Sequence, residues 1–150
     1  MQFELLTLTG TKFSGEVSEV HLTTAGGEIG ILPHHEPLVA VAKPGPVTVH
    51  TRGKAEVFAT FGGLLEVTLD GVKLMADEAE HADELVQDQI ELALKHAETL
   101  RAAAKDKHEL AHAQQLVDRA AVRLGVAKMH RSHSGRKAPG STTATPDDRS

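Results

Sequence analysis

Short runs of alternating hydrophobic and polar residues fill the first half of the chain, separated by turn signals. A period of two is typical of strands with one buried face. The clearest runs are Val17 to Leu22, Val47 to Val49, Val57 to Phe61 and Leu65 to Leu69. The turns carry glycine, as in Asp70-Gly71, where both residues tolerate a positive φ and predict a hairpin. We therefore expect many short antiparallel strands that form a β-sandwich or flattened barrel.

From residue 85 the hydrophobic positions change to a helical period. They form two stripes, Ile90, Leu94, Ala97, Arg101 and Ala104, then Leu110, Ala113, Val117, Ala120 and Leu124. The polar run from Lys105 to His108 separates them, and Asp106 followed by Glu109 has the spacing of a capping box that starts a helix. The pattern predicts an antiparallel hairpin of two helices. Both stripes are rich in alanine and bury little apolar area, so we expect the hairpin to dock weakly.

The end of the chain combines Ser, Thr, Gly, Pro and scattered basic residues. Such a segment buries too little surface to offset its conformational entropy, and we expect a disordered tail. The predicted fold class is therefore α+β, with a β-sandwich over residues 1–84, a helical hairpin over residues 85–129 and a tail over residues 130–150.

Charge and composition exclude several classes of protein. Residues 1–84 hold 5 Lys and Arg against 13 Asp and Glu, which is the opposite of the basic surface that nucleic acid binding needs. The chain has no cysteine, so it has no disulfide, thiolate metal site or thiol nucleophile. No apolar run approaches the roughly 20 residues that span a bilayer, and the N-terminus lacks the features of a secretory signal. We expect a cytoplasmic protein.

Catalytic and metal-binding motifs are weak. No serine before the tail lies in a Gly-x-Ser-x-Gly elbow, and no glycine loop continues into Gly-Lys-Ser/Thr, which argues against a hydrolase and a P-loop ATPase. His34-His35-Glu36 and the pair His108 and His112 suggest metal ligands. Adjacent strand residues point to opposite faces, however, so we interpret these histidines as solvated and expect neither a metal nor a cofactor.

The segment from Gly27 to Leu38 combines glycines, two prolines and ionisable groups. By itself it fits a binding loop and a structural connection equally well. It resembles the epsilon subunit of bacterial F-type ATP synthases, whose first domain carries Gly-Glu-(Ile/Leu)-Gly-Ile-(Leu/Tyr)-Pro-x-His-x-Pro-Leu. The resemblance covers residues 1–129 and continues in order through Lys43 to Val47, Phe61 to Val67, Ala76 to Glu80 and Arg119 to Val126.

The resemblance implies a non-catalytic subunit of the rotating central stalk, which links the gamma subunit to the c ring and couples proton flow to ATP synthesis. It implies peripheral association with the cytoplasmic face of the bacterial membrane through the complex. The contacts that it implies are Glu28, Ile29 and Gly30 with the c ring, and Leu32, His35 and Pro37 with gamma.

The family's hairpin has two arrangements, one folded against the sandwich and one extended along gamma into the alpha/beta catalytic head, where it inhibits ATP hydrolysis. In some members ATP binds the folded hairpin through an Ile/Leu-Asp-x-x-Arg-Ala motif and two arginines. Here Val86 and Gln89 replace the acidic and the basic position of that motif, whereas Arg119 and Arg123 match the two arginines. These arginines are candidate contacts for the catalytic head or, with half of the motif missing, for ATP.

A free-standing β-sandwich adaptor with a helical hairpin explains the strands and the exposed loop equally well. The two functions differ in their partners. A stalk subunit forms a stoichiometric complex with gamma, whereas an adaptor is stable and monodisperse alone and has no affinity for gamma.

Overall fold

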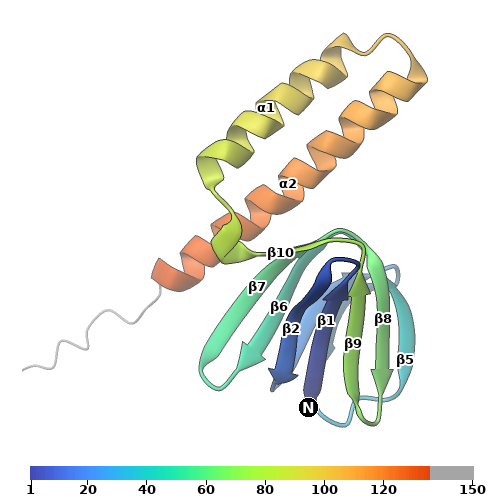
Figure 1. Ribbon diagram of the computed structural model, residues 1–150, viewed down its shortest axis with the longest axis vertical. Coiled ribbons are helices and arrows are strands. Elements are labelled where there is room, and N and C mark those ends of the chain that lie inside the picture. The colour runs from blue at the N-terminus through green and yellow to red at the C-terminus, as the bar shows by residue number, and fades with distance from the viewer. Residues whose placement is uncertain (136–150) are drawn as a thin grey trace, which may run out of the picture.

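The structure is a computed structural model that describes residues 1–135. Residues 136–150, which hold most of the expected tail, lie outside the described residues. Ten strands form the first part of the fold, and a short 3-10 helix and two α-helices follow (Figure 1). In chain order these elements are β1 (Gln2–Thr7), β2 (Gly10–Glu16), β3 (Glu19–Thr24), β4 (Gly27–Ile31), β5 (Leu38–Ala42), β6 (Gly45–Thr51), β7 (Lys54–Thr60), β8 (Gly63–Thr68), β9 (Gly71–Ala76), β10 (Ala79–His81), η1 (Ala82–Glu84), α1 (Gln87–Ala103) and α2 (Lys107–Gly135).

The strands wrap around one hydrophobic core. They pair in the order β10-β7-β6-β3-β5-β8-β9-β1-β2, and β4 adds to β3. The two ends of this order approach each other, because the Phe13 ring of β2 contacts the Phe58 ring of β7 with centroids 6.1 Å apart. The sandwich or flattened barrel predicted from the sequence is thus confirmed.

One strand pair departs from the expected antiparallel arrangement. β1 lies between β2 and β9 and runs parallel to β9. Parallel neighbours need a long crossover connection, and the intervening strands β2 to β8 provide it. The alternation of residues within a strand cannot reveal this direction.

Three hairpins share a Thr-x-x-Gly loop: Thr7 to Gly10, Thr24 to Gly27 and Thr68 to Gly71. In each loop the threonine hydroxyl donates to the glycine carbonyl and accepts the backbone N–H two residues after the threonine. The hairpin predicted at Asp70-Gly71 is confirmed. Its central residues, however, are Leu69 and Asp70, and Gly71 opens the next strand with a φ of 155°.

The predicted capping box joins the two helices. The Glu109 N–H donates to Asp106 Oδ1 at 2.8 Å, and Glu109 Oε2 accepts the Lys105 N–H at 2.9 Å, one residue before the position that the motif predicts. Within the hairpin, Ala97 of α1 and Ala113 and Val117 of α2 are buried. The expectation that Leu110 belongs to the buried stripe is wrong, because Leu110 is exposed in the first turn of α2.

The Asp106→Ala substitution is expected to destabilise the protein by about 1 kcal/mol, because it removes the N-cap acceptor of α2. Thermal unfolding would measure the change. Lys107→Ala is the matched control, since Lys107 is an exposed neighbour on the same turn. Equal unfolding temperatures for the two variants would contradict the capping role.

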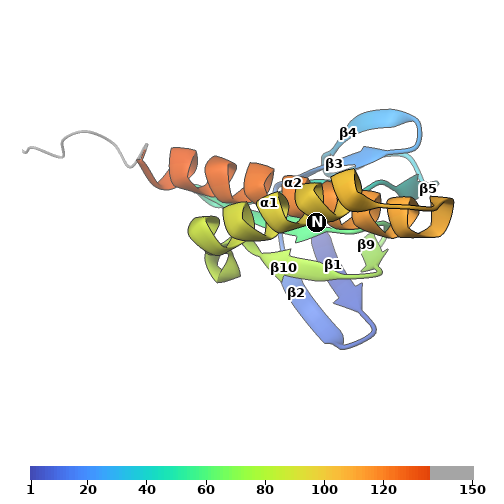
Figure 2. The same cartoon turned by 90° about the horizontal axis from the view of Figure 1, so that it is seen from above.

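The C-terminal half of α2 packs against the outside of β7, so the hairpin rises from one end of the sandwich (Figures 1 and 2). A second hydrophobic cluster fills this contact, with Val57, Ala59, Phe61, Ala82 and Val126 buried and Leu85, Val122 and Met129 beside them.

α2 continues through residues 130–135, which the sequence analysis assigned to the tail. His130 Nε2 lies 2.7 Å from Asp83 Oδ1, and Met129 packs against the second cluster. Through these contacts the end of α2 packs against distant parts of the chain. The local composition alone does not predict such contacts. No helix among the described residues is long and apolar enough to cross a membrane.

Candidate functional site: the docked hairpin

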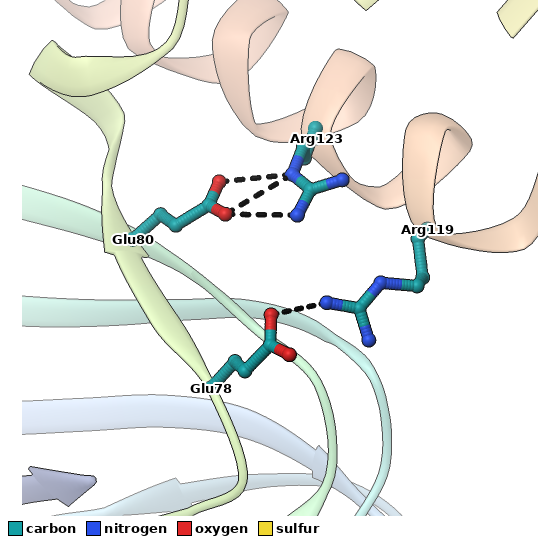
Figure 3. A network of polar contacts seen from close by, with 4 residues as sticks. All are labelled: Glu78, Glu80, Arg119 and Arg123. Atoms are coloured by element: carbon teal, nitrogen blue, oxygen red, sulfur yellow. Dashed lines mark hydrogen bonds and ion pairs between the residues drawn. The ribbon is translucent and has the colours of Figure 1, made fainter. Parts of the chain in front are cut away.

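Two ion pairs join α2 to β10, the last strand of the sandwich, and to the residue just before it (Figure 3). Arg119 pairs with Glu78 through its Nη2 atom. Arg123 forms a two-pronged contact with Glu80, in which Nε donates to Oε2 at 2.9 Å and Nη2 donates to Oε1 at 2.8 Å. Such two-pronged arginine–carboxylate pairs are the stronger and more directional kind of ion pair.

The spacing of the two pairs follows from the periods of a strand and a helix. Glu78 and Glu80 are two residues apart in extended chain, which separates them by about 6.7 Å and puts them on one face. Arg119 and Arg123 are four residues apart in a helix, which separates them by about 6 Å along the axis on one face. The two distances match, so both pairs can form at once.

Phe61 lies beneath both arginines. Its ring centroid is 4.4 Å from the Arg119 guanidinium carbon and 4.9 Å from that of Arg123. Phe61 is buried in the second cluster, so the arginines join the polar and the apolar parts of the contact. We call Phe61, Glu78, Glu80, Arg119 and Arg123 the latch.

Arg123 keeps its positive charge in the latch at ordinary pH values. The hydrogen bonds from Arg123 to Glu80 raise the pKa of Arg123, and the charges of Glu80 and Glu78 add to the increase against the opposing effect of burial. A group with a raised pKa stabilises the folded state below its ordinary pKa and loses this contribution only above it. Alkaline conditions beyond the usual arginine range would therefore be needed to discharge Arg123.

Sequence reasoning singled out Arg119 and Arg123 but assigned no role to Phe61, Glu78 or Glu80. All three lie within the segments that carried the family resemblance. The signal that could have revealed them is the two-residue spacing of acidic residues on a strand, opposite the four-residue spacing of arginines on a helix.

A small hollow of about 200 Å³ lies beside Arg123, between η1 and the two helices. Its lining includes Glu84, Val86 and Gln89, and Arg123 is its one cationic residue. A triphosphate needs several cationic or N–H donors, and here it would meet a carboxylate and an arginine that is already paired with Glu80. The hollow suits ATP poorly.

The candidate c-ring residues lie on β4. Glu28 is exposed and lies opposite Thr23 of β3, whereas Ile29 packs partly against the main core. Gly30 lies opposite His21. Glu28 is thus the one of the three candidate side chains that points freely into solvent.

The candidate gamma residues Leu32, His35 and Pro37 lie in the loop between β4 and β5. The His35 N–H donates to the Leu32 carbonyl at 3.1 Å, and His34 has a φ of 70°, which together form a type II turn. Leu32 and His35 line a hollow of about 320 Å³ with Met1. The N-terminus lies at the end of the sandwich opposite the hairpin (Figure 1). The structure thus separates these loop residues from the latch.

An apolar row crosses the outer face of four neighbouring strands. Val41 lies opposite Leu64, Leu64 opposite Met75, and Met75 opposite Leu6. The exposed fractions of Val41, Leu64 and Met75 are 58%, 39% and 38%. We call these four residues the apolar row. Contiguous exposed apolar residues of this kind mark interaction surfaces.

In the part of the chain that the structure describes, no group of three or more ligating side chains includes His34, His35, His108 or His112. His35 Nδ1 lies 2.7 Å from the Glu36 carbonyl oxygen. Residues 108–112 have the sequence His-Glu-x-x-His, which is the pattern of zinc proteases and was not considered above. In this chain, however, Glu109 caps the start of α2. Among the described residues, the metal-ligand group is instead Glu19, His21 and His50.

Fold and latch together define a class of protein, an interaction subunit built from a β-sandwich and a helical arm that docks on it. The family described as the ATP synthase delta/epsilon chain, beta-sandwich domain, matches residues 1–82. The ATP synthase epsilon chain of Herpetosiphon aurantiacus is 37% identical over 132 residues, which cover 88% of this chain and 97% of that one. The epsilon chain of Neisseria meningitidis serogroup C is 38% identical and covers 89% and 96%.

The fold is also similar to a chain in the mitochondrial ATP synthase of Euglena gracilis, a structure of OSCP, F1 and c ring. The TM-score is 0.68 at 21% identity, over 88% of this chain and 79% of that one. The chain therefore belongs to the ATP synthase epsilon chain family. Members of this family are non-catalytic subunits of the F-type ATP synthase and associate with the membrane peripherally, through the complex.

Proposed function

We propose that this chain joins the gamma subunit to the c ring in the central stalk, and that its helical hairpin inhibits ATP hydrolysis after it leaves the latch. The apolar row carries the first part of the proposal. Gamma binds across Val41, Leu64, Met75 and Leu6, because burial of this row supplies affinity that exposed ion pairs do not. The assembled protein lies on the cytoplasmic face of the bacterial membrane.

The edge strand β4 faces the c ring, and the loop that follows it, at the end of the sandwich opposite the hairpin, faces the lower part of gamma. Glu28 contacts the c ring with its exposed carboxylate, with Ile29 and Gly30 as its neighbours, while Leu32, His35 and Pro37 contact gamma. An exposed ion pair contributes at most about 1 kcal/mol, so Glu28 fixes orientation more than affinity.

The hairpin is a two-position arm. In the docked position the latch occupies both arginines, and in the extended position Arg119 and Arg123 contact acidic residues of the alpha/beta catalytic head. Because the head binds only the extended arm, it shifts the equilibrium from the docked towards the extended position. The size of the shift is set by the difference in its affinity for the two positions. The hollow beside Arg123 suits ATP poorly, so the proposal includes no nucleotide ligand.

Adding the full chain to a reconstituted catalytic head with gamma is expected to form a stoichiometric complex and to lower ATP hydrolysis. A chain that ends at residue 84 is expected to bind gamma without lowering hydrolysis, because it lacks the arm. Circular dichroism of the shortened chain would check that its strands are intact. Equal suppression by both chains would refute the inhibitory role of the hairpin, and failure of both to bind gamma would favour the adaptor.

A further inference from the structure

Three ligating side chains gather on the outer face of β3 and β6, away from the latch and the apolar row. Glu19 and His21 are two residues apart on β3, which puts them on the same face. Glu19 lies directly opposite His50 of β6 in the strand register. The pairing of two strands thus brings together one carboxylate and two imidazoles.

The three groups are close enough to share one ion. His21 Nε2 lies 2.6 Å from Glu19 Oε1, and one ligand atom from each residue lies within 4.8 Å of the others. The two imidazole rings meet edge to face with centroids 5.5 Å apart. A tetrahedral zinc ion with ligand atoms at about 2.0–2.1 Å holds those atoms about 3.4 Å from one another. Rotation of the half-exposed side chains brings the three ligand atoms to this separation.

The neighbouring strand leaves room for the imidazole of His21. Gly30 of β4 lies opposite His21, and a Cβ at this position would come within 2.9 Å of His21 Cε1. Bare backbone beside the imidazole allows His21 to lie against Glu19. His21 is also the one member of the group that lines a surface hollow of about 390 Å³, together with Gly30, Thr48 and Met129 of α2.

We propose that Glu19, His21 and His50 bind one zinc ion, with water as the fourth ligand. Two imidazoles and a carboxylate are a donor set that zinc accepts, whereas calcium and magnesium prefer oxygen ligands alone. The ion braces β3 against β6, and β3 is the strand that pairs with β4. It is a binding site beyond the proposed stalk function and does not depend on it.

Calorimetric titration of the full chain with zinc chloride tests the site. The double variant His21→Gln/His50→Gln is expected to lose one equivalent of zinc, and Glu19→Gln to weaken binding about tenfold. The matched control is His108→Gln/His112→Gln, which removes the competing helical histidine pair and is expected to retain that equivalent. All four histidines are at least partly exposed, so neither double variant disturbs a core.

A second measurement uses cobalt(II) as a spectroscopic probe. Tetrahedral absorption bands are expected for the wild type and for the His108/His112 control, but not for the His21/His50 double variant. Zinc at about 100 times its dissociation constant is expected to raise the unfolding temperature by several degrees in the wild type and in the control, but not in the His21/His50 double variant. Identical zinc stoichiometry and cobalt spectra for wild type and the His21/His50 variant would overturn the proposal.

Discussion

The Leu64→Glu substitution is expected to weaken the complex with gamma by about 30-fold to 1,000-fold. Leu64 is the central member of the apolar row, flanked by Val41 and Met75 on the neighbouring strands. A buried central side chain of an interface is worth about 2–4 kcal/mol, which corresponds to this range. A carboxylate at residue 64 would also be desolvated without a partner.

The binding of each variant to a head–gamma complex, measured as a dissociation constant, tests this expectation. Leu92→Glu is the matched control, because Leu92 is an apolar residue of α1 that is 67% exposed. The free variants should unfold at nearly the wild-type temperature, since residue 64 already faces solvent in part. If gamma binds both variants with equal affinity, the apolar row is not its docking surface.

The apolar row shows what the local pattern can predict and what it cannot. Alternation within β8 correctly predicts that Leu65 and Val67 face the core. That the outward residues of four strands align in one row depends on register, and one of these pairings is the parallel contact of β1 with β9. Contacts between distant strands are not encoded in a period of two.

The same distinction holds for the helices and for the metal-ligand group. The Asp106 cap was predictable because its partners lie within four residues of it. The continuation of α2 past Met129 was not, because His130 contacts Asp83 from a distant part of the chain. His21 and His50 were likewise only two of ten histidines until strand pairing brought them together.

The latch lies between these cases. Spacing alone puts Arg119 and Arg123 on one helix face, and spacing alone puts Glu78 and Glu80 on one strand face. That these faces meet depends on the packing of Val126 against Phe61 and its neighbours. The sequence therefore predicts which residues share a face, whereas the pairing of the two faces could be found only from the folded structure.

Charge reversal in the latch is expected to change the position of the hairpin. Arg123→Glu replaces the two-pronged contact with a like-charge pair against Glu80 and should cost the docked state about 2–3 kcal/mol, or about 30-fold to 150-fold in its population. Because Arg123 is also a proposed contact of the catalytic head, the effect on hydrolysis is measured with Glu80→Gln. This variant breaks the same ion pair, leaves Arg123 intact and should inhibit hydrolysis more strongly. The double variant Glu80→Arg/Arg123→Glu restores opposite charges and should recover much of the docked state.

Hairpin position can be measured directly because the chain has no cysteine of its own. Cysteines introduced at Thr11 of β2 and Ala111 of α2, both exposed, accept a fluorescent pair whose energy transfer reports docking. Lys128→Glu, a reversal at an exposed residue of the same helix, should leave transfer and hydrolysis unchanged. If the double variant is no more docked than Arg123→Glu alone, the Glu80 contact does not hold the arm. Docking would then rest on the Arg119–Glu78 pair and on the second hydrophobic cluster, because charge reversal at residues 80 and 123 leaves both intact.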